Sequence, residues 1–371
     1  MLWFLIACFI PAFVVSYCAT AMMKRIAPRI GLVDQPVGVK AHSTHTKVTP
    51  LGGGIGIYLG FLVPVIVAQL AALWVTANPE MMEWMPAEIA SHLEGVLTRS
   101  KTMWAIILGG SVFVIMGLLD DLTSLPWLPR LLVQFLVASA LVAGGIRATV
   151  FVTQPWVGMV LTVLWIVLLT NSLNFLDNMD GLSAGIGLIA SVLFAIVMLT
   201  SVSEPRWLVG GALLVLAGSL AGFLWHNWHP ASIFMGDSGS MFIGLMLASL
   251  TILGTFYDPA LSSQHVMLAP LCVLAVPLYD LTTVIVIRLS KGQSPFHPDK
   301  NHFSHRLVAL GLSRKHAVQT VHLTTLTTGL GALLLYWLPG WAGALLVIAL
   351  VVCVLAIITI LEKAGRRQNG D

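Results

Sequence analysis

The sequence NSLNFLDNMDGLSAG, residues 171–185, stands between two apolar runs, Trp156–Leu169 and Gly187–Leu199. Apolar runs of this kind are typical of helices that cross a membrane. The polar stretch between them carries two amides and two carboxylates at strict three-residue spacing: Asn171, Asn174, Asp177 and Asp180. The pattern therefore predicts two membrane helices that are joined by a short segment rich in polar groups.

This polar stretch has two interpretations. If it is helical, residues three apart lie on one face and form a stripe of amides and carboxylates. Such a set of oxygen ligands suits a hard cation such as Mg²⁺ better than a soft one. Alternatively, it is an interhelical loop in which Asn, Asp and Gly are ordinary turn and cap residues. The stretch alone does not decide between the two.

The composition is that of a polytopic membrane protein. Of the 371 residues, 57% are hydrophobic and only 9% are charged, and the mean hydropathy is +0.91, which excludes an ordinary soluble domain. The opening sequence MLWFLIACFIPAFVVSYCATAMM lacks the basic region and cleavage site of a secretory signal, so we expect a retained span. The four cysteines lie in apolar runs without a CxxC pair and predict small buried side chains, not disulfides.

We expect an all-α polytopic bundle of about eleven transmembrane helices, because each span needs about 20 apolar residues. The expected spans lie near residues 2–23, 51–77, 102–119, 127–146, 156–172, 183–202, 207–225, 239–256, 265–288, 318–338 and 341–361. No internal repeat or soluble domain interrupts them, so residues 1–371 are expected to form a single integral-membrane domain. Any chemistry must then come from loops and the adjoining helix ends.

The basic residues predict the orientation of this bundle. When the loops are assigned alternately to the two sides, fifteen of the nineteen Lys and Arg residues fall on one side. The positive-inside rule makes that side cytoplasmic, with the N-terminus outside and the C-terminus in the cytoplasm. Asp120-Asp121, the acids after Asn171, Asp237 and the loop Arg288–Lys315 then share the cytoplasmic face. An outer loop, residues 78–100, carries four Glu residues without identifiable chemistry.

Two acidic motifs lie at the ends of expected spans. Asp120 and Asp121 close the span ending SVFVIMGLLDD, where the helix dipole disfavours acids unless a cation offsets the repulsion. The segment FMGDSGS, from Phe234, opens the span 239–256; its Asp237 can hold a metal ion and its free backbone N–H groups a phosphate. The alternatives are acids in a short solvated loop and an ordinary N-cap.

Basic groups gather in the loop SPFHPDKNHFSHRL. On a helix His302 and His305 would share a face, and Lys300 and Arg306 would complete a cationic patch suited to a diphosphate. A zinc site lacks its third and fourth ligands at standard spacing. Lys47, in the first cytoplasmic loop, can neutralise a phosphate.

Three further polar residues lie in or beside apolar runs. His226 and His229, in WHNWH, are interpreted as parts of an aromatic-rich interfacial turn. Asp280 lies inside an expected span, which makes it a functional candidate. Its position, about two turns from the cytoplasmic end, favours a structural pairing that fixes a helix near the site.

In this order the motifs resemble a known family, the polyprenyl-phosphate N-acetylhexosamine-1-phosphate transferases. This family includes the bacterial undecaprenyl-phosphate GlcNAc-1-phosphate transferases and the phospho-MurNAc-pentapeptide transferase. The matching motifs cover nearly the whole chain: DQP from Asp34, KVTPLGG from Lys47, LDD from Leu119, NSLNFLDNMDG from Asn171, FMGDSGS from Phe234 and PDKNHFSH ending at His305. The chain is closer to the GlcNAc-type branch.

The resemblance implies a multi-pass protein of the bacterial inner (plasma) membrane with its active site facing the cytoplasm. A polyprenyl (undecaprenyl) phosphate would attack the β-phosphate of a UDP-N-acetylhexosamine, with Mg²⁺ or Mn²⁺ as cofactor. The products would be UMP and a lipid diphosphate sugar that starts a cell-envelope glycan. Such phosphoryl transfer depends on positioning and charge neutralisation. Nucleic acid has no part in this reaction, and the family resemblance also implies a homodimer.

The resemblance and the cationic patch together assign roles to individual residues. The expected catalytic residues are Asp120, Asp121, Asp177, His302 and His305. The expected substrate-binding residues are Lys47, Asn174, Asp180, Asn227, Phe234 and Arg306, with Asp180 toward the nucleoside and Phe234 stacked on uracil. The expected metal ligands are Asp237, Asn174, Asp120 and Asp121.

The sequence departs from the family pattern at two positions. The GlcNAc-type branch usually has H-x-H-H, whereas this chain has Ser304 between Phe303 and His305. The family commonly has Gly after the first acid of D-G-x-D-G, and here Asn178 takes that place. Because Asn tolerates left-handed backbone, we expect the turn to survive. Both changes preserve the reaction class and leave the sugar open.

Other functions remain as alternatives. Within the family, the alternative is transfer of phospho-MurNAc-pentapeptide. A cation-coupled transporter would place charges near mid-bilayer in repeated halves, and only Asp280 resembles that pattern. A non-catalytic scaffold would tolerate loss of the acids, but Asp120, Asp121, Asp177 and Asp237 are all present.

Overall fold

The computed structural model describes residues 1–34, 48–78, 80–81, 87–148, 154–202, 205–254, 264–296, 299, 301–338 and 340–368. Within these residues the regular secondary structure is helical except for two short antiparallel strands, β1 (Val33–Asp34) and β2 (Thr49–Pro50). Lys47 and Lys300, which we expected near a phosphate, lie outside the described residues.

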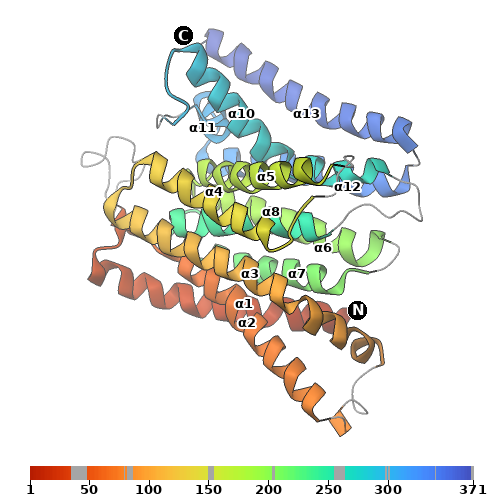
Figure 1. Ribbon diagram of the computed structural model, residues 1–371. Coiled ribbons are helices and arrows are strands. Elements are labelled where there is room, and N and C mark those ends of the chain that lie inside the picture. The colour runs from red at the N-terminus through yellow and green to blue at the C-terminus, as the bar shows by residue number, and fades with distance from the viewer. Residues whose placement is uncertain are drawn as a thin grey trace.

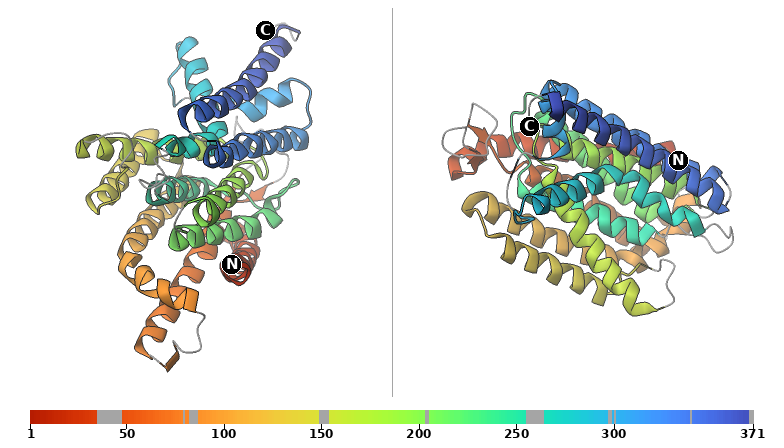
Figure 2. Two further views of the ribbon diagram at one scale, coloured as in Figure 1. Left: turned by 90° about the vertical axis from the view of Figure 1, so that its right-hand side faces the viewer. Right: turned by 90° about the horizontal axis from the view of Figure 1, so that it is seen from above.

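The helices form one elongated bundle. They are α1 (Leu2–Ile26), α2 (Gly53–Ala77), α3 (Ala87–Thr123), α4 (Trp127–Ala143), α5 (Pro155–Phe175), α6 (Leu182–Ile196), α7 (Trp207–Asn227), α8 (Asp237–Gly254), α9 (Ala269–Val273), α10 (Ala275–Ser290), α11 (Phe303–Ala309), α12 (Arg314–Trp337) and α13 (Gly340–Gln368). Short turns of other helix types are η1 (Ala27–Ile30), η3 (Val197–Ser201) and η5 (Gln264–Leu268). Figure 1 shows α1 and α2 along one edge and α13 along the opposite edge, with α5 and α8 between them. The views in Figure 2 agree.

The helical membrane fold is confirmed, but the number of full spans is lower than expected. In the part of the chain that the structure describes, nine helices are long and apolar enough to cross a membrane. A tenth span results if Gln264–Val273 and Ala275–Ser290, which are bent by 65°, are counted as one. The remaining expected span is α4, whose 17 residues reach only about 26 Å.

Two local expectations were wrong. Helix α3 begins at Ala87, so much of the expected outer loop 78–100 is helical. Ala, Leu and Glu favour a helix without being uniformly apolar, and the hydropathy pattern therefore does not detect this part. Of the four cysteines, all free, only Cys272 is buried, while Cys18 and Cys353 are exposed on the helix surfaces.

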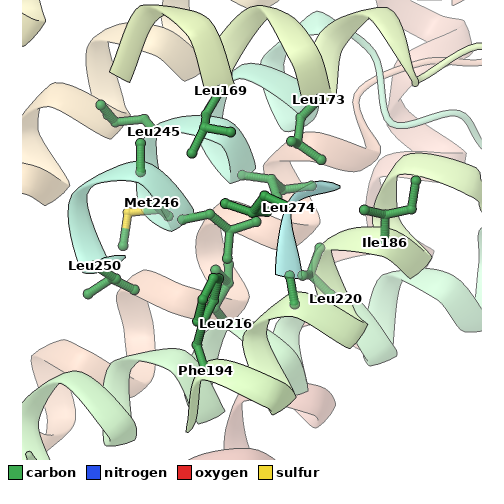
Figure 3. Packing of buried hydrophobic residues seen from close by; sticks show 14 of the residues in the cluster. Leu169, Leu173, Ile186, Phe194, Leu216, Leu220, Leu245, Met246, Leu250 and Leu274 are labelled. Carbon is green, nitrogen blue, oxygen red and sulfur yellow. The ribbon is translucent and has the colours of Figure 1, made fainter. Parts of the chain in front are cut away.

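Helix α8 lies at the centre of the bundle. Nearly every residue from Ser238 to Thr251 is buried, because α8 packs against α2, α3, α5, α6 and α7. Figure 3 shows Leu245, Met246 and Leu250 of α8 meeting apolar side chains from α5, α6 and α7. At Gly117 of α3 the packing leaves no space for a side chain, since a Cβ atom there would lie 2.2 Å from the backbone nitrogen of Ser238. The first turn of α8 is therefore held closely against the end of α3.

Gly117→Ala is expected to lower the thermal unfolding temperature, because its methyl group would push on the backbone of α8. Gly95→Ala in the same helix is the matched control, since its Cβ would meet no atom within 4 Å. Replacing an exposed helical glycine by alanine stabilises a helix by about 1 kcal/mol, so this control should unfold at the same or a higher temperature. Equal unfolding temperatures for the two variants in detergent would contradict the close packing.

Candidate active site

Polar groups from three helices converge on Asp237, the first residue of α8. Its Oδ2 accepts a hydrogen bond from Arg130 Nη1 of α4 at 2.7 Å. Its Oδ1 accepts one from Asn174 Nδ2 of α5 at 2.9 Å. Its backbone N–H donates to Asp121 Oδ1, at the end of α3, at 3.0 Å. One residue thus connects the ends of α3, α4, α5 and α8.

Arg130 supplies the positive charge that the adjacent acids need. It forms an ion pair with Asp120 as well as with Asp237, and Asp120 Oδ1 also accepts from Leu125 N at 2.6 Å. Arg130 belongs to no motif that we identified, yet it is the only charged residue in the sequence of α4, which is the signal that could have revealed it.

The side chain of Asp121, from α3, lies against the N-terminal end of α8. Besides the Asp237 N–H bond, the close approach of Asp121 requires Gly236, where a Cβ would lie 2.4 Å from Asp121 Oδ2 and where φ is 75°. The backbone N–H groups of Gly239 and Ser240 donate to Gly236 O at 3.1 and 3.3 Å. The expected set of free N–H groups for a phosphate is therefore wrong, because internal acceptors take three of them.

The four polar residues at three-residue spacing, from Asn171 to Asp180, do not form one helical stripe. Helix α5 ends at Phe175, so Asn171 and Asn174 lie on the helix while Asp177 and Asp180 lie in the following turn. We call residues 176–181 the acid loop. The helical interpretation therefore holds for the two amides, and the loop interpretation holds for the two acids.

The two helical amides connect α5 to its neighbours at successive turns. Asn174 bonds to Asp237 and also to Ser240 Oγ at 2.9 Å. One turn earlier, Asn171 Nδ2 donates to Gln134 Oε1 of α4 at 2.6 Å. Gln134 is 2% exposed and lies one turn from Arg130, which also binds Asp237. The pair Gln134–Asn171 therefore sets the separation of α4 and α5 directly below the Asp237 contacts.

Asp177 is half-buried, and the pKa of its carboxyl group is raised. Burial raises the pKa of Asp177 to about 8, and the negative charges of Asp121 and Asp180 add to the rise. Its location between two acids makes it a group that exchanges protons near neutral pH.

His229 and Asn227 hold the acid loop from the side of α7. Asp180 Oδ2 accepts from His229 Nδ1 at 2.7 Å and from Ala231 N at 3.1 Å, so His229 is part of the site surroundings and not only of an interfacial turn. Asn227, which is 4% exposed, accepts from Gly181 N at 2.9 Å and donates to Ile233 O at 2.8 Å. The expected contact of Asn227 with uracil remains a prediction.

Phe234 is held by β2 and by the first residue of α2. Its N–H donates to Pro50 O at 2.8 Å, and its carbonyl accepts from Gly53 N at 2.9 Å. The motifs KVTPLGG and FMGDSGS, far apart in sequence, are thereby joined through their backbones. Phe234 is half-buried. The stacking of its ring on uracil stays a prediction.

Asp280 fixes His302, the residue directly before α11. The fully buried Asp280 pairs with His302 Nδ1 at 2.9 Å and accepts from Phe303 N at 2.5 Å. The expected structural pairing of Asp280 is therefore present. The rings of His302 and His305 lie together, with centroids 6.4 Å apart.

Arg306 and Asp299 each form an ion pair with another residue of this chain. Arg306, 5% exposed, pairs with Glu362 of α13 at 2.9 Å and donates to Thr283 of α10 at 3.1 Å. Asp299 receives two hydrogen bonds from Arg288, at 3.0 and 3.1 Å. Burial alone would raise the pKa of Asp299, but the bonds from Arg288 and Asn301 lower it well below its usual range. The substrate-binding role of Arg306 stays a prediction.

We expect Asp177→Asn to stabilise the protein more at high pH than at low pH. Because the pKa of Asp177 is raised, the folded state holds a proton that the unfolded state releases, and stability falls as pH rises from about 4 to about 8. The gain in unfolding temperature over wild type should therefore be larger at about pH 8 than at about pH 5. Asp299→Asn is the control: its lowered pKa predicts an equal loss at both pH values. A pH-independent gain for Asp177→Asn would contradict the raised pKa.

Gln134→Leu and Asn171→Leu should each lower the unfolding temperature. Asn171→Leu leaves the buried Gln134 without its hydrogen bond, at a cost of about 1–3 kcal/mol, and Gln134→Leu removes one of the two acceptors of Asn171 Nδ2. The double variant Gln134→Leu with Asn171→Leu should recover part of that loss, since two apolar side chains leave no unsatisfied group. Losses that add in the double variant, measured in the same detergent, would show that the two amides act independently.

A known protein family matches the part of the chain that carries these acids. The profile of Glycosyl transferase family 4 matches residues 103–255, which include Asp120, Asp121, Asp177 and Asp237. The probable undecaprenyl-phosphate N-acetylglucosaminyl 1-phosphate transferase of Bacillus subtilis (strain 168) is 32% identical over 356 residues, covering 94% of this chain and 89% of that protein.

Two further relatives separate the branches of the family. The decaprenyl-phosphate N-acetylglucosaminephosphotransferase of Mycobacterium leprae is 33% identical over 382 residues, covering 96% of this chain and 90% of that protein. The phospho-N-acetylmuramoyl-pentapeptide-transferase of Limosilactobacillus reuteri is 29% identical over 210 residues, covering 53% of this chain and 59% of that protein. The chain therefore belongs to glycosyl transferase family 4, among the polyprenyl-phosphate N-acetylglucosamine-1-phosphate transferases.

Proposed function

We propose that this protein transfers GlcNAc-1-phosphate from UDP-GlcNAc to a polyprenyl phosphate of the undecaprenyl class and releases UMP. The observation that supports the proposal most is the convergence of Asp120, Asp121 and Asp237 at one end of the bundle. The relatives with GlcNAc in their names match over nearly the full chain, which supports GlcNAc over MurNAc-pentapeptide.

The donor chemistry of the same acids fits Mg²⁺. Carboxylate and amide oxygens are the ligands that this cation prefers, and Asp237, Asp120, Asp121 and Asn174 belong to one hydrogen-bonded group. Among the described residues no three acids or histidines form a metal-binding cluster, and Arg130 bridges Asp120 and Asp237. We propose that these four residues hold Mg²⁺ after Arg130 releases one of the acids. When bound, the ion supplies charge neutralisation for the diphosphate.

The residues around this group would divide the remaining work. Asp120 or Asp121 would accept the proton of the lipid phosphate, whose oxygen then attacks the β-phosphorus of the UDP-sugar while UMP leaves. His302, held by Asp280, and His305 would lie beside the phosphates and donate hydrogen bonds to them. Asp180 and Phe234 would contact the nucleoside.

The charge distribution supports an active site that faces the cytoplasm of a bacterial plasma membrane. Lys24 and Arg25 end α1, and Arg288 lies near the end of α10. Asp120, at the end of α3, shares that membrane face in the predicted topology. Basic residues at helix ends favour the cytoplasmic side, where UDP-sugars are made.

The test is UMP release by the purified protein with undecaprenyl phosphate, Mg²⁺ and, in parallel, UDP-GlcNAc, UDP-GalNAc or UDP-MurNAc-pentapeptide. We expect release with UDP-GlcNAc that requires both lipid and metal. In sealed inside-out vesicles release should not need detergent, whereas right-side-out vesicles should need it. Release with UDP-MurNAc-pentapeptide alone would move the protein to the other branch, and no release with any donor would contradict the proposal.

Asp237→Asn should lower the rate of UMP release by on the order of a hundredfold or more, because it removes a charge at the reacting centre while preserving the side-chain shape. Asp299→Asn, which removes a carboxylate paired with Arg288, is the control and should retain the rate of its folded fraction. Near-normal turnover by Asp237→Asn would exclude this residue from the site.

A further inference from the structure

A buried hydrogen bond connects the acid loop to α11. Ser304 Oγ donates to Asn178 Oδ1 at 2.6 Å, and Ser304 is completely buried. Asn178 Nδ2 in turn donates to Phe175 O, at the end of α5, at 2.8 Å. Because water does not reach Ser304, no solvent molecule can replace Asn178 as its partner.

Asn178 and Ser304 are the two positions at which this sequence departs from the family pattern, and the structure places them in contact. Backbone geometry does not explain Asn178. The left-handed residue of the acid loop is Gly181, with φ of 72°, and Asn178 is not among the residues with positive φ. The expected left-handed turn at Asn178 was therefore wrong. Asn178 makes its contacts through its side-chain amide, which accepts from Ser304 Oγ and donates to Phe175 O.

The location of the bond couples two groups of site residues. Asn178 directly follows Asp177, and Ser304 directly precedes His305. The other anchors of α11 lead to different helices: Asp280 of α10 binds at His302 and Phe303, and Glu362 of α13 binds Arg306. The Asn178–Ser304 bond is thus a direct side-chain contact between α11 and the acid loop.

We propose that Asn178 and Ser304 form a positioning pair that sets the distance between His305 and the Asp177 carboxyl group for the phosphate-transfer step. This inference rests on the proposed function. A pair with this role acts on the transition state more than on binding of the nucleotide, since the nucleoside contacts lie on Asp180 and Phe234. A misplacement of catalytic groups by about 1 Å can lower a rate by up to about a hundredfold.

The test is a double-mutant cycle with Ser304→Ala, Asn178→Ala and the double variant, with kcat and KM for UDP-GlcNAc measured beside the unfolding temperature. Each single variant should lower kcat by about tenfold and leave KM within about twofold. The kcat of the double variant should be no lower than that of the slower single variant, because each change already breaks the same bond.

Thr251→Val is the matched control. It removes another interhelical hydrogen bond, from Trp165 Nε1 of α5 to Thr251 Oγ1 of α8, which is 3.1 Å long. Thr251 lies about 21 Å along α8 from Asp237, so its loss should lower the unfolding temperature without changing kcat.

Unchanged kcat in folded single variants, or losses that multiply in the double variant, would overturn the pair while the proposed function stands. A kcat loss in Thr251→Val of the same size as in Ser304→Ala would reduce the pair to a stability effect and also overturn it. A wild-type protein that releases no UMP contradicts the proposed function, and the pair with it.

Discussion

The candidate site depends on the ion pair between Asp237, the first residue of α8, and Arg130 of α4. A half-buried carboxylate is stabilised when it is paired and hydrogen-bonded. Arg130 and Asn174 satisfy its oxygens, and they draw the ends of α4 and α5 toward α8. Asp121, a like charge, binds the backbone of α8 and not the carboxylate, so the positive end of the helix offsets its repulsion.

Uncharged amides do most of the positioning around these charges. Gln134 and Asn171 fix α4 against α5, Asn227 fixes the acid loop against the segment before Ile233, and Asn178 fixes that loop against α11. An amide can satisfy several backbone and side-chain groups without adding charge in a low-dielectric interior. These amides thus position the acid loop and the ends of α4 and α5, while Asp120, Asp237 and His302 are held by ionisable partners.

Much of the site was predictable from local sequence, and the reason lies in the motifs. Asp120-Asp121, the acid loop and FMGDSGS each stand at the end of an apolar run, where a change in hydropathy marks a membrane surface. Arg130 and Gln134 escape this reasoning because they lie singly within an apolar helix and have no motif around them. His229 escapes it for another reason: an aromatic-rich turn is an adequate local explanation, and only Asp180, distant in sequence, shows otherwise.

The sequence by itself determined the helical membrane class, the approximate position of every helix in the expected spans, and the order of motifs that identifies the family. These follow from hydropathy and short-range spacing, which are properties of neighbouring residues. Only the tertiary structure decided that α5 ends between Asn174 and Asp177, that Arg130 joins Asp120 to Asp237, and that Asn178 meets Ser304. The partners in these last contacts include residues more than a hundred positions apart, and such pairings arise from helix packing, which no local pattern encodes.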